Sequence, residues 1–270
     1  MKNISPKRLL NNIFLKTSGG GGGFDADATA YIAAVEAADG AALEAGVKTA
    51  INDFVVGCKA DGIWTALKAS CILSGARTLS GAFVPLAGTA PTNNNFVSGD
   101  YNRKTGLVGD GSSKYLNSNR QNATDPQNSR HQAIFVSTGD SLATGTYIAG
   151  GGDGFTGMFN VSNSLWGYIS NGVTSIVAAS QGNTVAFKGI TRSNSSQALL
   201  RSGGITTSGS ITSVSENTNR TVAVFAQNAG SIGFYTNGRL AFYSIGESLD
   251  LALLDARVTT LIAAYAAAIP

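Results

Sequence analysis

Residues that could carry out catalysis or hold a metal are scarce in this chain. Its 270 residues include one histidine, two cysteines and four glutamates, and charged residues make up only 13% of the total. No glutamate has a second acid two positions further on, and no G-x-S-x-G sequence occurs. Carboxylate-pair hydrolysis, serine hydrolysis and zinc binding each need such residues. We therefore predict a non-enzymatic protein with no catalytic residues, no metal and no cofactor.

Long apolar runs and long cationic runs are also missing. No stretch of eighteen apolar residues occurs, so no membrane span is expected. The net charge is only +3 and no lysine–arginine run exceeds two residues, which argues against nucleic-acid binding. A secretory signal is disfavoured because Asn11 and Asn12 interrupt the first apolar stretch and no small-residue cleavage pattern follows.

The chain instead begins with a basic, partly apolar arm, residues 1–23, which ends in the glycines Gly19–Gly23. Consecutive glycines lose the most conformational freedom on ordering, so this stretch is expected to be a hinge. We expect the arm to anchor the chain by becoming ordered in a groove of a partner protein. The arm side chains expected to fill that groove are Lys7, Arg8, Leu9, Leu10 and Phe14.

Residues 24–91 are rich in alanine and have helical periodicity. A cap at Asp25 or Asp27 predicts a first helix that ends at residues 39–40. Apolar residues spaced by three and four predict a second helix over about 41–58 and a third over about 63–73. The two cysteines, Cys58 and Cys71, would lie in this block as small buried thiols. We expect the block to pack against the domain that follows.

The pattern changes in residues 92–270, where short apolar runs alternate with turns rich in Gly, Asn and Ser. Turn signals such as Asn171-Gly172 and Asn237-Gly238 separate ten or more candidate strands. Strands in such number without intervening helices predict an antiparallel β-sandwich. After a cap at Ser248, apolar residues at helical spacing predict a C-terminal helix. The predicted fold is thus mainly β, with helical segments at both ends of the sandwich.

Two segments of this region resemble parts of concanavalin-like, laminin-G-like jelly rolls. Residues 106–116, GLVGDGSSKYL, resemble an early strand pair, and residues 232–246, IGFYTNGRLAFYSIG, resemble the closing hairpin. The resemblance implies a lectin-like jelly roll. With the arm, the DGIW sequence at 61–64 and DYNRKTGL at 100–107, the whole chain resembles phage virion structural proteins.

The virion resemblance implies a location in the particle, docked on other virion proteins, in several copies. A tail-fibre or appendage protein anchored by its arm is the first interpretation, with a homotrimer expected. A capsid-decoration protein is one alternative, and a polysaccharide-degrading enzyme is a second that the carboxylate count disfavours. The jelly roll would serve attachment to a host-surface glycan.

Sugar binding calls for exposed aromatic rings beside amide groups. On a strand over 165–169, Trp166 and Tyr168 share one face because successive side chains alternate. Burial of Trp166 in the core is the alternative reading. The candidate glycan-binding residues are Trp166, Tyr168, Asn160 and Asn163, with Phe155 and Asn171 beside them.

Two further features carry weaker signals. The glycine-rich segment 150–154 reads as a ligand-lining loop, a calcium loop or a hairpin tip, and calcium would need several carboxylates. His131 is expected at the surface or at a strand edge. The acids considered as calcium ligands are Asp140 and Asp153 in one group, and Asp100, Asp110 and Asp125 in another.

Overall fold

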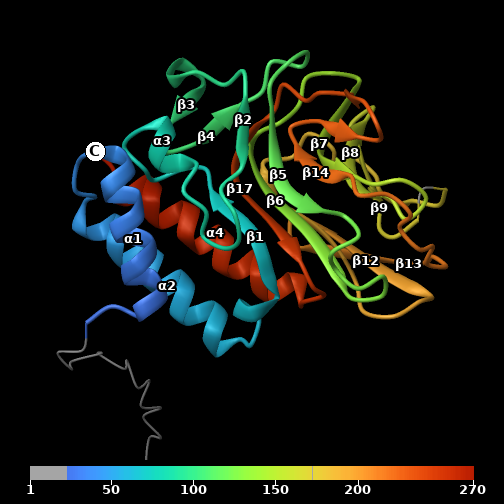
Figure 1. The fold of residues 1–270 in the computed structure, drawn as a ribbon, viewed down its shortest axis with the longest axis horizontal. Helices are drawn as coiled ribbons and strands as arrows, with labels where there is room; N and C mark the ends of the chain where they lie inside the picture. Colours follow the sequence, from blue (N-terminus) through green and yellow to red (C-terminus); the bar gives the residue numbers. More distant parts are fainter. Residues whose placement is uncertain (1–22, 172) are drawn as a thin grey trace, which may run out of the picture.

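The computed structural model describes residues 23–171 and 173–270. The anchoring residues predicted in the arm, from Lys7 to Phe14, lie outside the described residues. In the described part, the chain forms two mainly antiparallel β-sheets packed face to face, with a layer of helices on one of them (Figure 1). The predicted β-sandwich, preceded by helices and followed by a C-terminal helix, is confirmed.

One sheet, here called the covered sheet, carries the helices on its outer face. Its strand order is β13-β12-β11-β6-β17-β4-β3, and β1 pairs with β17 beside β4. Its strands are β1 Leu67–Ile72, β3 Tyr101–Asn102, β4 Gly106–Val108, β6 Arg130–Thr138, β11 Ala186–Arg192, β12 Gln197–Ser202, β13 Ile205–Ser210 and β17 Arg239–Gly246.

The second sheet, here called the open sheet, has the order β10-β9-β8-β7-β14-β5-β2, with the short pair β15 and β16 beside β7. Its strands are β2 Thr92–Asn94, β5 Tyr115–Gln121, β7 Thr144–Gly150, β8 Thr156–Val161, β9 Ser164–Tyr168, β10 Ile176–Ala178, β14 Thr221–Val224, β15 Gln227–Asn228 and β16 Ile232–Gly233.

The helices are α1 Ala26–Asp39, α2 Ala45–Ala60, the short α3 Leu79–Ala82 and α4 Leu251–Ala268. Asp25 caps the start of α1 by accepting a hydrogen bond from the Asp27 amide. Gly40 ends the helix in the left-handed conformation, with a φ of 65°, which glycine adopts without strain. The first helix is thus confirmed. The second begins at Ala45 rather than at residue 41. The C-terminal helix is confirmed, although Asp250 rather than Ser248 is its cap.

Two apolar cores follow from this layering. Between the sheets, inward side chains such as Ile134, Met158 and Leu200 form one core. The outward side chains of the covered sheet, among them Phe135 and Phe242, pack instead against the helices. The α4 helix is long and apolar enough to cross a membrane by length and composition alone, but its buried face packs on α2 and β11 as a core helix does.

The third predicted helix, over 63–73, is wrong. Residues Trp64–Ala66 form one 3₁₀ turn, and the chain then enters strand β1, where Cys71 lies opposite Tyr243 of β17. The strand is buried on both faces, with Ile72 against the helices and Cys71 between the sheets. Because β1 is only six residues long and buried on both faces, periodicity cannot distinguish it from a short buried helix.

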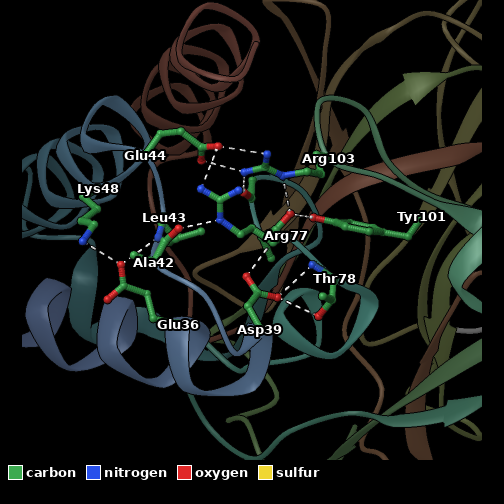
Figure 2. A network of polar contacts seen from close by, with 12 residues as sticks. Glu36, Asp39, Ala42, Leu43, Glu44, Lys48, Arg77, Thr78, Tyr101 and Arg103 are labelled. Atoms are coloured by element: carbon green, nitrogen blue, oxygen red, sulfur yellow. Dashed lines mark hydrogen bonds and ion pairs between the residues drawn. The ribbon is translucent and has the colours of Figure 1, made fainter.

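The predicted packing of residues 24–91 against the sandwich is confirmed. Besides β1, a network of ion pairs joins the two parts (Figure 2). The Glu44 carboxylate accepts hydrogen bonds from Nη1 and Nη2 of Arg103, at 3.1 and 2.7 Å, and lies 3.2 Å from Arg77. The Tyr101 hydroxyl donates to the Ala76 carbonyl at 2.8 Å. The helical block and the sandwich therefore form one continuous structure.

Candidate functional site

Aromatic side chains gather on the outer face of the open sheet. On β9, Leu165 is buried between the sheets, whereas Trp166 and Tyr168 point outward and are partly exposed. The register of β8 with β9 places Phe159 opposite Trp166, so Phe159 shares their face. The predicted common face of Trp166 and Tyr168 is confirmed, and Trp166 does not enter the core between the sheets.

The rings hold one another in place. Phe155 and Phe159 stack with centroids 5.8 Å apart, and the Tyr168 ring meets both edge-on, at 6.1 and 5.7 Å. Offset-stacked and edge-to-face arrangements of this kind are favourable for aromatic rings. Gly157 lies beneath them, because a Cβ there would be 2.5 Å from Ala149 Cβ and 3.1 Å from both phenylalanine rings. The glycine therefore allows the rings to lie close to the sheet.

A glycine-rich loop, residues 150–154, forms one wall beside the rings. Gly151 has a φ of +128°, which only glycine adopts readily. The Glu216 carboxylate accepts hydrogen bonds from the Gly152 amide at 2.8 and 2.9 Å and from Asn122 Nδ2 at 2.8 Å. Burial alone would raise the pKa of Glu216, but hydrogen bonds from Thr218, Gly152 and Asn122 lower it. The loop is therefore fixed by an ionised side chain rather than being a free hairpin tip.

The rings and the loop enclose a hollow of about 520 Å³, here called the aromatic pocket. This volume lies in the usual range for small-molecule sites, which are mostly apolar with a few polar groups. The pocket is lined by Gly151, Gly152, Asp153, Phe155, Phe159, Val161, Trp166, Tyr168, Arg220, Gln227 and Ala229.

Two charged groups lie on its rim. The Arg220 guanidinium donates through Nη1 to the Gly151 carbonyl at 3.0 Å. The Asp153 carboxylate is exposed and accepts from Asn217 Nδ2 at 2.6 Å. An apolar floor with a cation, a carboxylate and the Gln227 amide at its edge can bind a ligand that is itself part apolar and part polar.

The predicted amide partners do not line this pocket. Asn160 lies on the opposite face of the open sheet, is fully buried, and donates to the Leu142 carbonyl at 2.9 Å. Asn163 is exposed in the turn after β8 and accepts from the Asn183 amide at 3.1 Å. Asn171 is buried and holds a turn, donating to the Thr212 carbonyl. All three amides support the backbone.

The sequence did not point to five of the pocket residues, which are Phe159, Val161, Arg220, Gln227 and Ala229. Alternation along 156–161 together with the turn at Ser162 would have placed Phe159 beside Trp166. No local pattern marks Arg220 or Gln227. They reach the pocket because β14 and β15 pair with β7, far from it in sequence.

The carboxylates considered as calcium ligands have other partners. Asp140 accepts from Thr236 Oγ1, Asp100 pairs with Lys114 at 2.6 Å, and Asp125 pairs with Arg120. Asp110 accepts backbone amides of its own turn. Over residues 23–171 and 173–270, no three His, Cys, Asp or Glu side chains are close enough together to hold a metal ion.

The single histidine was expected at the surface or at a strand edge, but it is buried in β6, a central strand of the covered sheet. His131 is 1% exposed, with Nε2 at 2.8 Å from Ser244 Oγ and Nδ1 beside the Glu247 carbonyl. Burial lowers the pKa of His131 to about 4. The side chain lies on the same face of β6 as Ala133 and Phe135, which is the face that packs against the helices. Its role is structural, as is that of the buried, free thiols Cys58 and Cys71.

Comparison with known proteins finds similarity in three dimensions only. No family model matches the chain, and no curated protein matches it. Among solved structures, the Ruminococcus gnavus IT-sialidase CBM40 bound to α2,3-sialyllactose is 10% identical, with a TM-score of 0.39 over 48% of this chain and 82% of that one. The botulinum neurotoxin serotype D binding domain is 13% identical, with a TM-score of 0.45 over 72% and 51%. At such identities the similarity concerns the fold and assigns no ligand to this chain.

Proposed function

We propose that this chain is a non-enzymatic glycan-binding protein and that the aromatic pocket is its binding site. The observation that carries the proposal is the set of outward rings on the open sheet, Phe155, Phe159, Trp166 and Tyr168, beside a polar rim. A sugar ring has apolar C–H faces and polar edges. Aromatic rings can cover the faces while Asp153, Gln227 and Arg220 bond the hydroxyl groups.

The composition of the pocket supports binding rather than hydrolysis. Glycoside hydrolysis by the usual mechanism needs two carboxyl groups on either side of the scissile bond. Among the lining residues Asp153 is the one carboxylate. Glu216 does not line the pocket, and its oxygens already accept hydrogen bonds from Gly152, Asn122 and Thr218.

Glycan-array binding followed by calorimetry tests the proposal. Trp166→Ala and Tyr168→Ala should abolish binding while circular dichroism and the melting temperature show an intact fold. Phe234→Ala is the matched control, because this phenylalanine is 64% exposed and does not line the pocket. An array on which no glycan binds, or binding that survives both pocket variants, refutes the proposed site. Reducing ends released from host polysaccharide would refute the non-enzymatic part.

We further propose, from the sequence resemblance, that the protein is a phage virion component of the tail-appendage type. The arm, residues 1–23, would dock on another virion protein, and several copies would raise the avidity for a host-surface glycan. Deleting residues 1–18 should prevent incorporation into particles, and light scattering should show a homotrimer. Normal incorporation of the shortened chain refutes the anchor, and antibody labelling of the head refutes the tail location in favour of capsid decoration.

A further inference from the structure

We infer that the aromatic pocket selects sugars that carry an anionic group, and that Arg220 binds that group. The inference rests on the proposed function and goes beyond it in naming the class of sugar. Three features of the Arg220 guanidinium carry it: its hydrogen bonds, the ion pairs of the surrounding residues and its part in holding the loop.

Most of the hydrogen-bonding capacity of Arg220 is unused. A guanidinium has five N–H donors in a fixed planar fork. In the described part of the chain, Arg220 makes one side-chain hydrogen bond, from Nη1 to the Gly151 carbonyl at 3.0 Å. This bond fixes the orientation of the plane. The Nε and Nη2 edge, which suits bidentate contact with an oxyanion, has no partner among residues 23–171 and 173–270.

No carboxylate neutralises this cation within the same residues. Every ion pair there involves other groups, and none includes Arg220. Asp153, the acid on the pocket lining, is exposed and bonded to Asn217 instead. The guanidinium is partly buried beside aromatic rings, where the lower effective dielectric strengthens its attraction for an anion.

A purely structural role for Arg220 is the competing explanation. One N–H is enough to hold the Gly151 carbonyl, and the loop is already held by Glu216 through Gly152 and Asn122. The Gly230 backbone lies close to the guanidinium, and a side chain there would meet it, since a Cβ would lie 2.9 Å from Nη2. A fixed, unneutralised cation at the edge of a ligand-sized hollow is better suited to binding an anion.

The test compares sugars that differ in charge. Calorimetry would measure lactose, 3′-sialyllactose and 3′-sulfolactose against the full-length protein. We expect the better of the two acidic sugars to bind about 10- to 100-fold more tightly than lactose, the range for hydrogen bonds to a charged group. The two acidic probes identify whether a carboxylate or a sulfate is preferred. Raising the salt concentration should weaken acidic binding and leave lactose unchanged.

Variants separate charge recognition from loss of the site. Arg220→Gln should remove the preference, so that acidic and neutral sugars bind with similar affinities, whereas Asp153→Asn should keep the preference for acidic sugars. Equal wild-type affinity for acidic and neutral sugars overturns the inference and leaves glycan binding standing. An Arg220→Gln variant that loses both sugars equally also overturns it. If no sugar binds, the proposed function fails as well. Should the variant not fold, the salt dependence of the wild-type protein decides.

Discussion

Replacing Gly157 with alanine tests how the aromatic pocket is built. Gly157 lies opposite both Ala149 on β7 and Tyr168 on β9. A Cβ would lie 2.5 Å from Ala149 Cβ, almost 1 Å inside ordinary contact, which begins at 3.4 Å. The two strands cannot separate without losing ladder hydrogen bonds. We therefore expect the strain of an overpacked site, about 1–3 kcal/mol.

Urea unfolding measures this cost. With a slope of about 2 kcal/mol per molar urea, the unfolding midpoint should fall by roughly 0.5–1.5 M. Glycan affinity should fall too, because the added methyl group also lies 3.1 Å from the Phe155 and Phe159 rings and displaces them. The intrinsic preference of a strand for alanine over glycine acts in the opposite direction, so any fall in the midpoint comes from the contacts.

Two further variants test whether the loss of stability comes from the contact between Gly157 and Ala149. Gly99→Ala is the matched control, since a Cβ at Gly99 meets nothing within 4 Å. Combining Gly157→Ala with Ala149→Gly removes the nearest obstructing atom, and the cycle of the two changes should show a coupling energy of about 1 kcal/mol. If Gly157→Ala unfolds at the same urea concentration as Gly99→Ala and binds glycan normally, the rings do not depend on the glycine and the reasoning is wrong.

Three other expectations concern stability. Because burial lowers the pKa of His131 in the folded state to about 4, from its ordinary value of 6.5, the unfolded state binds a proton at a higher pH than the folded state does. His131 therefore gives its full contribution above pH 6.5, and stability is lost as the pH falls from 6.5 to about 4. The chain has one histidine, so its imidazole NMR signals report this pKa directly, and titration near 6.5 would contradict the burial. Glu44→Gln should destabilise the protein by about 1–3 kcal/mol in thermal or urea unfolding because it leaves the Arg103 guanidinium without its anion; an unchanged midpoint would show that the contact in Figure 2 contributes nothing. Lys188 is buried and forms no ion pair with a carboxylate among the described residues, and burial lowers its pKa to about 7. Because the unfolded state holds this proton up to about pH 10.5, the contribution of Lys188 to stability should rise between pH 7 and 10.5. Lys188→Met should flatten that rise, and a variant with the wild-type pH profile would refute the assignment.

The sandwich could be predicted because its strands are separated by strong turn signals. Asn237-Gly238 marks the approach to β17, and strict alternation along β9 places Trp166 and Tyr168 on one face. These are local properties that each segment carries in its own residues. The long C-terminal helix follows in the same way from apolar residues at helical spacing.

The remaining features depend on contacts that are distant in sequence. β1 is a strand because β17, more than 170 residues later, supplies its partner, as the Ser70 Oγ bond to the Tyr243 carbonyl shows. His131 is buried beside the segment that leads from β17 to α4, where its Nδ1 meets the Glu247 carbonyl, and a strand pattern cannot reveal this contact. Arg220 enters the pocket through the pairing of β14 with β7. Local sequence patterns predict which side chains of a strand share a face. Which element packs against that face depends on the topology of the whole chain.

The topology also determines where a ligand can bind. Both sheets carry large outward side chains, but Phe135 and Phe242 of the covered sheet are sealed beneath the helices, where Phe242 meets Phe54 of α2 edge-on at 6.0 Å. In the described chain the helices lie on the covered sheet and not on β8 and β9 of the open sheet (Figure 1). The glycine-rich loop lines one side of the pocket that the outward rings form. Trp166 and Tyr168 remain partly exposed on this face, beside the buried rings of Phe155 and Phe159 and next to Arg220. The face of the sandwich turned away from its helices is therefore where we place the function.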